Sequence, residues 1–470
     1  MKFAKRLQSL QANVFADMDQ AKAKAKASGK EIIDLSLGSS DLAASPHVIA
    51  AIEASMHDPS THGYLLFHGT QAFRQAAASW YTKRYGIPVD PETEVLSLIG
   101  CQEGTAHLPL AVLNPGDFAL LQDPGYPSHA GGVYLAGGQV YPMPLLAENE
   151  FLPVFEDIPS LVLSQARMMV LSYPHNPTTA IAPLSFFQKA VAFCRQHDLV
   201  LVHDLPYADL VFSEEEGEET PVLKIDAKTR GQGDTETERF SSFVVNANSW
   251  MPNLKIAEGA EGAEGAGEAG GEEFSSLLCA RQRMASNPKS EVQNPKSLAP
   301  SILQADPDKT VSIEFFTFSK SYNMGGFRIG YAVGNAQLIR ALRQVKAVID
   351  FNQYRGILNG AIAALNSPQE GVKATVATFQ KRRDAFVQAL YRIGWQVPIP
   401  KATMYVWAKL PQPWESDSVQ FCTQLVEETG VAASPGAGFG KAGEGYVRFA
   451  LVHEPAILET AVERIAGFLR

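Results

Sequence analysis

The chain has little cysteine and no long hydrophobic run. Its four cysteines, Cys101, Cys194, Cys279 and Cys422, are too far apart to form a C-x-x-C metal or redox motif. A disulfide framework is not expected in 470 residues with so few thiols. No apolar run reaches the ~18 residues of a membrane span, and residues 1–30 lack the apolar core of a signal peptide. We therefore expect a cytoplasmic protein with no metal and no membrane partner.

Basic residues are also in the minority. Forty Lys and Arg stand against 50 Asp and Glu, for a formal net charge of −10, which argues against a nucleic-acid partner. Hydrophobic residues make up 46% of the chain and charged residues 19%, so most of it can bury a core. The length allows one large unit and a smaller one.

Strand-like and helix-like segments alternate over most of the first 350 residues, which is typical of a mostly parallel sheet flanked by helices. The predicted strands are Val95–Ile99, Phe118–Gln122, Gln139–Pro142, Met168–Ser172, Leu199–His203, Val311–Phe316 and Ile329–Val333. The predicted helices are 70–85, 103–113, 127–136, 183–197 and 335–350, with an N-terminal helix over 4–28 whose apolar face holds Leu7, Leu10, Val14 and Met18.

The last part of the chain mixes helices and strands and predicts a smaller α+β domain. Its elements are helices over 368–393, 418–428 and 455–469 and strands over Met404–Leu410 and Tyr446–Val452. We expect an N-terminal arm over 1–45 that packs with this domain, a large domain over 46–345, and a small domain over 346–470. Within the large domain, residues 214–300 are rich in Gly, Glu and Ser and predict a disordered insertion.

The first chemical signal is Thr317-Phe318-Ser319-Lys320, which closes a buried strand. In open α/β sheets, ligands bind at the carboxyl ends of strands. A buried lysine loses its proton readily, and its neutral amine can form a Schiff base with a carbonyl. The hydroxyls of Thr317 and Ser319, with Arg328 eight residues on, would suit a phosphate.

The second signal is Asp204, at the end of the apolar strand Val200-Leu201-Val202-His203. A carboxylate in that position needs a cation, and a protonated ring nitrogen would serve. Tyr207 would point a phenol into the same pocket. Alternatively, Asp204 merely caps the following turn.

Three further strand ends carry polar or aromatic groups. Gly100-Cys101-Gln102-Glu103-Gly104-Thr105 opens a helix whose N–H groups attract phosphate, and Tyr126 in Asp123-Pro124-Gly125-Tyr126 could stack on a flat ring. Asn176, in a rigid turn, could bond a ring substituent. Arg448 lies inside an alternating strand and needs an anion, such as a substrate carboxylate or an internal partner. A Schiff-base lysine, an aspartate for a ring nitrogen, a phenol, a stacking aromatic and a phosphate loop together describe pyridoxal 5′-phosphate.

In these motifs the chain resembles the fold-type-I, class I/II aminotransferases that use pyridoxal 5′-phosphate. The resemblance implies that Lys320 carries the cofactor and, with Asp204 and Tyr207, performs catalysis. It implies cofactor contacts for the ring (Asp204, Tyr207, Asn176, Tyr126) and for the phosphate (Glu103, Gly104, Thr105, Thr317, Ser319, Arg328). Tyr64 resembles the family tyrosine that reaches a phosphate across a homodimer interface. The substrate would contact Arg448, Gly38 and Asn176.

Within the family, the chain looks most like the LL-diaminopimelate and succinyldiaminopimelate aminotransferases. We therefore expect transfer of an amino group between an L-amino acid and a 2-oxo acid by a ping-pong mechanism, of the LL-diaminopimelate type or the aspartate/glutamate type. A lyase or decarboxylase that uses the same cofactor is the alternative enzyme, and a cofactor-binding regulator is the alternative without catalysis.

Overall fold

We describe a computed structural model, in which residues 3–10, 14–213 and 298–470 are placed. The predicted insertion over 214–300 lies outside the described residues except for its last three. One of these, Ala299, is buried in the main hydrophobic core. The packed chain therefore resumes slightly earlier than predicted.

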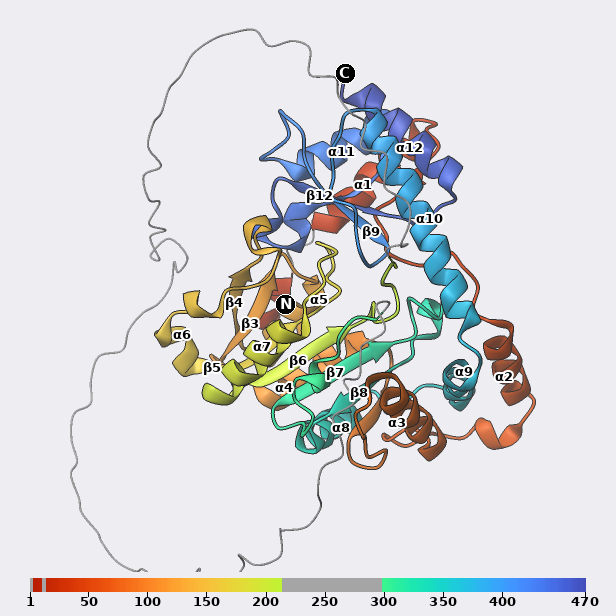
Figure 1. Cartoon of the computed structure of the whole chain (residues 1–470), viewed down its shortest axis with the longest axis vertical. Helices are drawn as coiled ribbons and strands as arrows, with labels where there is room; N and C mark the ends of the chain where they lie inside the picture. Colours follow the sequence, from red (N-terminus) through yellow and green to blue (C-terminus); the bar gives the residue numbers. More distant parts are fainter. Residues whose placement is uncertain (1–2, 11–13, 214–297) are drawn as a thin grey trace, which may run out of the picture. The chain divides into compact units, whose positions relative to one another are not determined.

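A seven-stranded sheet forms the centre of the larger part of the structure (Figure 1). Its order is β2-β8-β7-β6-β5-β3-β4, and β8 runs antiparallel to both of its neighbours. The strands are β2 (Val95–Leu98), β3 (Phe118–Asp123), β4 (Gln139–Pro144), β5 (Ala166–Leu171), β6 (Val200–Leu205), β7 (Ser312–Thr317) and β8 (Gly330–Gly334). The predicted α/β fold with a mostly parallel sheet is confirmed.

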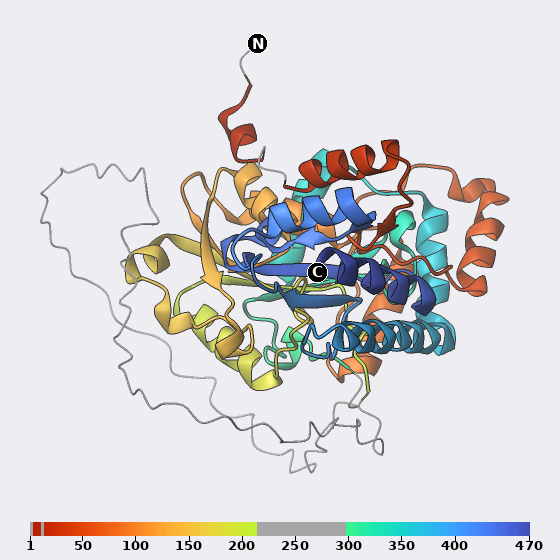
Figure 2. The same ribbon diagram turned by 90° about the horizontal axis from the view of Figure 1, so that it is seen from above.

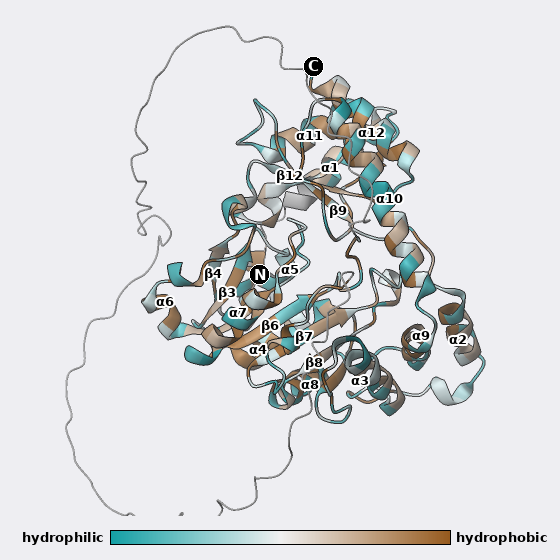
Figure 3. Cartoon of the chain, viewed as in Figure 1, coloured by the Kyte–Doolittle hydropathy of each residue, from teal (hydrophilic) through white to brown (hydrophobic). Residues whose placement is uncertain are grey.

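Helices cover both faces of this sheet, because successive side chains of its strands enter two different hydrophobic cores. Leu120 and Phe316 belong to one core, whereas the adjacent Leu121 and Phe315 belong to the other. Most residues of these strands are therefore hydrophobic, as Figure 3 shows, although β6 and β7 also carry polar residues such as Asp204 and Glu314. The first core includes α3 (Gln71–Tyr85), α7 (Leu184–Gln196) and α9 (Arg355–Asn366), and the second includes α4 (Cys101–Val112), α5 (Pro127–Ala136) and α8 (Ala336–Ile349).

A third core joins the beginning of the chain to its end. Strands β11 (Ser434–Pro435), β12 (Tyr446–Ala450) and β9 (Tyr405–Lys409) form an antiparallel sheet. Strand β1 (Ile33–Asp34) pairs with β10 (Val431–Ala432), and α1 (Val14–Ala27) packs on α11, as Figure 2 shows. The other helices of this core are α10 (Glu370–Arg392), α11 (Ser418–Thr429) and α12 (Pro455–Phe468).

The N-terminal prediction is wrong in one respect. The expected helix over 4–28 is a 3-10 helix, η1 (Lys5–Leu10), followed by α1 from Val14. The two segments contact different partners: Arg6 in η1 donates to the Leu135 carbonyl in the last turn of α5, whereas α1 packs on α11. Leu7 and Leu10 are 41% and 37% exposed, so they do not extend the buried face of Met18.

Helices α2 (Pro46–Met56), α6 (Ser160–Gln165) and α9 were not predicted. Helix α9 was missed because its glycines do not favour a helix. One of them, Gly360, is required by packing, since a Cβ there would lie 2.7 Å from Ile52 of α2. Glycine lowers helix propensity, but here it permits the two helices to approach closely.

No helix in the described ranges is long and apolar enough to cross a membrane. The remaining 3-10 helices are η2 (Pro59–Thr61), η3 (Ala147–Asn149), η4 (Phe155–Asp157), η6 (Ile302–Gln304), η7 (Gly325–Phe327), η8 (Gly436–Phe439) and η9 (Lys441–Gly443).

Candidate active site

A cavity of about 700 Å³ lies at the carboxyl ends of the central parallel strands. It collects side chains that follow β3, β6 and β7, as expected for an open α/β sheet. It is completed by Gly38 and by residues of the third core. The predicted site residues that line it are Gly38, Tyr126, Asn176, Asp204, Tyr207, Thr317, Ser319, Lys320, Arg328 and Arg448.

Lys320 lies three residues beyond the end of β7 and is half-buried. Its Nζ donates a 2.5 Å hydrogen bond to the Gly38 carbonyl and lies 5.7 Å from the centre of the Tyr207 ring. Among the described residues no carboxylate forms an ion pair with this amine, and the Gly38 carbonyl holds it at the cavity.

Asp204 is buried at the end of β6, with its two carboxylate oxygens in different situations. Oδ2 lies 3.0 Å from Nε2 of His129 on α5, while Oδ1 is buried with no hydrogen-bond partner among the described residues. A buried oxygen without a donor is costly. A protonated ring nitrogen in the cavity would satisfy it.

His129 was not among the predicted site residues. It stands three residues after Tyr126 in the first turn of α5, and that helix begins at the ligand-binding edge of the sheet. Its position three residues after Tyr126 was the feature of the sequence that could have predicted a place in the site. Nearby, burial lowers the pKa of His175 to about 3, and the proximity of His129 contributes. His175 is thus neutral at physiological pH, where its Nδ1 lies 2.8 Å from the Thr178 hydroxyl.

An anion-binding end of the cavity forms where α4 begins. Thr317 donates to the Ser319 hydroxyl at 2.9 Å, and Arg328 lies beside Gly100. Gly100 has φ +74°, and a Cβ there would lie 2.6 Å from the Arg328 guanidinium. Glycine therefore lets the guanidinium approach the helix N-terminus, where the first N–H groups have no partner within the helix.

The prediction for Glu103, Gly104 and Thr105 needs correction. The Glu103 carboxylate accepts a 2.7 Å hydrogen bond from buried Lys346 and another from the Ile99 N–H. Burial acts to raise its pKa, but His107 and Lys346 outweigh burial and hold the pKa below its usual value. A Cβ at Gly104 would lie 2.9 Å from Phe315, and Thr105 bonds the Gln102 carbonyl. In this loop it is Cys101 and Gln102 that line the cavity.

Arg448 is buried and well supported. One guanidinium nitrogen donates to Asn176 Oδ1 at 2.9 Å, and another donates to the Ser36 carbonyl at 2.6 Å. Its Nε has no hydrogen-bond partner among the described residues. The guanidinium also lies 4.3 Å from the Tyr405 ring centre and 4.6 Å from that of Phe439. No carboxylate pairs with Arg448 in the part of the chain that the structure describes, which favours an external anion over an internal ion pair.

Tyr64 does not line this cavity. Its side chain is 93% exposed and contacts Phe351, with 6.1 Å between ring centres. Within one chain it therefore contributes nothing to the site.

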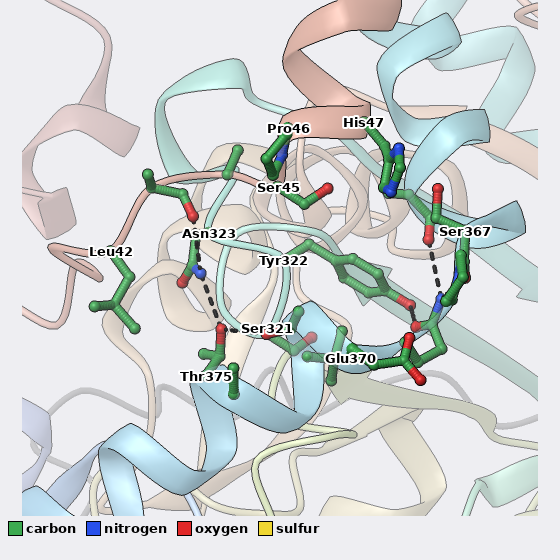
Figure 4. Close-up of a pocket in the computed structure, with 18 of the residues that line it drawn as sticks. Leu42, Ser45, Pro46, His47, Ser321, Tyr322, Asn323, Ser367, Glu370 and Thr375 are labelled. Carbon is green, nitrogen blue, oxygen red and sulfur yellow. Dashed lines mark hydrogen bonds between the residues drawn. The ribbon is translucent and has the colours of Figure 1, made fainter.

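A second cavity, of about 590 Å³, lies behind the loop that follows Lys320 (Figure 4). Its polar groups are bonded to one another: Tyr322 donates to Gln369 at 2.8 Å, and Asn323 donates to Thr375 at 3.0 Å. It contains no arrangement of reactive groups comparable to that around Lys320.

Comparison with known proteins identifies the family. Residues 30–233 and 284–465 match the family model described as aminotransferase class I and II. The chain belongs to this family. Similar relatives include proteins named LL-diaminopimelate aminotransferase from Dehalococcoides mccartyi and from Moorella thermoacetica, each 36% identical over 100% of this chain and 99% of the relative.

Solved aminotransferase structures agree. A probable N-succinyldiaminopimelate aminotransferase from Thermus thermophilus is 33% identical, with a TM-score of 0.75 over 97% of this chain and 99% of that chain. The substrate-bound BacF structure from Bacillus subtilis gives a TM-score of 0.79 at 29% identity, over 100% and 98% of the two chains. The resemblance inferred from the motifs is confirmed: the chain is a transaminase that uses pyridoxal 5′-phosphate.

The cavity of about 700 Å³ that contains Lys320 fits that cofactor. It offers an amine that can attach to an aldehyde, a buried carboxylate oxygen that lacks a donor, and an anion-binding end beside Gly100.

Proposed function

We propose that the cavity residues catalyse amino-group transfer between an L-amino acid and a 2-oxo acid in two half-reactions. The observation that carries this proposal is the presence, in one cavity, of the Lys320 amine, the unpartnered Asp204 oxygen and the Arg448 guanidinium. When bound, pyridoxal 5′-phosphate supplies an aldehyde for the amino group and a ring that withdraws electrons from the substrate Cα.

We propose that Asp204, oriented by His129, keeps a proton on the ring nitrogen.

Other residues would bind the rest of the cofactor. Tyr126 would stack on the ring, while Tyr207 and Asn176 would contact its hydroxyl. Thr317, Ser319 and Arg328 would hold the phosphate, with the N–H groups of Cys101 and Gln102 in place of the predicted Glu103–Thr105.

Lys320 has two roles in this proposal. Its amine would attach the cofactor. Once the substrate amino group displaces it, the free amine would take the proton from the substrate Cα and deliver it to the former aldehyde carbon of the cofactor. The Gly38 carbonyl supports both roles, because its hydrogen bond keeps the free amine facing the cavity.

Arg448 would bind the substrate α-carboxylate. Asn176 and Ser36 fix two of its nitrogens, so the guanidinium is already oriented before the substrate arrives. A planar fork of donors matches a carboxylate in two hydrogen bonds.

For the substrate, we propose an amino acid of the LL-diaminopimelate type. The names of the relatives support this choice. In addition, Asp19 and Lys22 of α1 line the cavity as an ion pair, with 2.8 Å between their charged groups. An adjacent acid and base would complement the ammonium and carboxylate at the far end of such a substrate.

This proposal predicts the outcome of a donor screen. The purified enzyme, loaded with pyridoxal 5′-phosphate, should convert LL-diaminopimelate to its 2-oxo product and transfer the amino group to a 2-oxo acid. L-Glutamate and L-aspartate test the alternative substrate type. Loss of CO2 or of a side-chain fragment, measured by mass spectrometry, would instead indicate a decarboxylase or lyase.

We also propose that the enzyme is a homodimer. The support is an exposed apolar patch formed by Tyr64, Leu66, Val348, Ile349 and Phe351, in which Asn352 donates to the Leu66 carbonyl and joins the two segments. Contiguous apolar patches of this kind mark protein interfaces. The resemblance would bring Tyr64 of one copy to the phosphate in the other.

The patch gives a direct prediction. Val348 is 85% exposed, so Val348→Asp should leave each chain folded while it separates the copies. Light scattering should report the monomer mass and activity should fall. Leu161→Asp, at another exposed apolar residue on α6, is the matched control and should remain dimeric. A Val348→Asp protein with unchanged mass would contradict the proposed interface.

We keep the division of the chain into an arm over 1–45, a large domain over 46–345 and a small domain over 346–470 as a proposal, supported by the separate third core. A cytoplasmic location is likewise proposed. It agrees with the unpaired state of Cys101, Cys194 and Cys422.

A further inference from the structure

Tyr405, on β9, is a buried phenol in the active-site cavity that was not among the predicted site residues. Its hydroxyl lies 2.9 Å from the hydroxyl of Tyr207, and the two rings meet nearly edge to face at 5.8 Å. A residue of the third core thus contacts a residue that the resemblance assigns to the cofactor.

The phenol also meets the residue that holds Lys320. A Cβ at Gly38 would overlap the Tyr405 hydroxyl oxygen, so only glycine fits beneath it. The carbonyl of Gly38 accepts the hydrogen bond from Lys320 Nζ at 2.5 Å. The side chains of Tyr405 and Lys320 therefore both contact Gly38.

Charged or titratable groups face Tyr405 from several elements. The cations are Lys320 after β7 and Arg448 on β12, and the phenols are Tyr207 after β6 and Tyr126 at the start of α5. Burial acts most strongly and favours the neutral phenol. The two cations and the hydrogen bond from Tyr207 outweigh it, so the pKa of Tyr405 lies below its usual value.

Tyr207 behaves in the opposite way. Burial and the proximity of Tyr405 raise the pKa of Tyr207 well above its usual value. The 2.9 Å distance fits either hydroxyl as the donor, and the opposite directions of the two pKa shifts favour donation from Tyr207 to Tyr405.

We propose that Tyr405 is a positioning residue for the aminotransferase reaction: its hydroxyl anchors the Tyr207 hydroxyl 2.9 Å away and, packed against Gly38, influences the titration of the nitrogen through which Lys320 would hold the cofactor. The inference rests on the proposed roles of Lys320 and Tyr207. The aromatic ring of Tyr405 also packs against the Arg448 guanidinium, and this contact would stabilise the binding site for the substrate carboxylate.

The test is a pH titration of the visible absorbance of the enzyme loaded with pyridoxal 5′-phosphate. Tyr405→Phe removes the oxygen but keeps the ring, so the titration midpoint should fall by about one pH unit, the lower end of the effect of a nearby opposite charge. For the same reason, kcat should fall about tenfold. The KM for the amino donor should stay unchanged, whereas Tyr405→Leu should also raise KM because it loses the ring.

Tyr331→Phe is the matched control. Tyr331 is a buried tyrosine on β8 whose hydroxyl has no hydrogen-bond partner among the described residues, so this variant should leave the midpoint unchanged. Incorporation of 3-fluorotyrosine at position 405 keeps the shape and makes the phenol more acidic, so the midpoint should rise. This second variant decides the matter if Tyr405→Phe folds poorly.

An unchanged midpoint both in Tyr405→Phe and in the 3-fluorotyrosine protein would overturn the inference while leaving the aminotransferase proposal intact. Failure of the wild-type enzyme to transaminate any donor would instead overturn the proposed function.

Discussion

Replacing Lys320 by alanine should abolish transamination, with kcat reduced by more than about 10⁴-fold, because one residue supplies both the attachment point and the general base. The loaded protein should also lose the visible absorbance that comes from covalent attachment. Borohydride treatment followed by peptide mapping should fix the cofactor to Lys320 in the wild-type chain and nowhere in the variant.

Lys320→Arg is the control for charge. It keeps the cation near the Gly38 carbonyl but cannot form the covalent link, so it should be as inactive as the alanine variant. Both variants should melt close to the wild-type temperature without cofactor, because the amine makes a single hydrogen bond at the cavity. Substantial activity in Lys320→Ala would refute the assignment.

The second large effect is expected for Asp204→Asn. The amide has nearly the same shape as the carboxylate, yet it cannot hold a proton on the ring nitrogen. We expect the variant to retain the cofactor and to lose on the order of 10²- to 10³-fold in kcat, the size of effect seen when a preorganised electrostatic group is removed. Stopped-flow absorbance of the first half-reaction would measure the loss at the proton-transfer step.

Asp306→Asn is a suitable control for Asp204→Asn. Asp306 is also a fully buried carboxylate, but it accepts the N–H groups of Val311 and Ser312 at the start of β7 and pairs with Arg195. Its substitution should lower the melting temperature without changing kcat. An unchanged kcat in Asp204→Asn would contradict the proposed role of the carboxylate.

Strands such as β2, β3 and β7 were predictable because they are short, mostly apolar segments that are buried along their whole length. The cavity residues at their carboxyl ends followed from the same reasoning. Asp204, Tyr207 and Lys320 come together because Asp204 pairs in register with Phe315 of β7. Local sequence and one topological rule were sufficient for that part of the site.

Other contributions depended on contacts between distant segments. Tyr405 and Arg448 are brought together by the pairing of β9 with β12. His129 on α5, which follows β3, reaches Asp204 at the end of β6, two strands away in the sheet. Glu103 was misjudged because its partner, Lys346, lies 243 residues further along the chain. A lone acidic residue in a phosphate-attracting loop gives no sign that a buried cation will draw its side chain away.

The chain leaves the sheet after β6 and returns before β7 at neighbouring points, since the Ala299 N–H donates to the Ala208 carbonyl. Those two strands are adjacent, parallel partners in the sheet, and 84 residues lie between Ser213 and Leu298. Doubling the length of such a connection costs only about 0.6 kcal/mol in closure entropy. We therefore expect changes in coding length at this crossover to leave the paired β6 and β7, and the catalytic groups that follow them, in register.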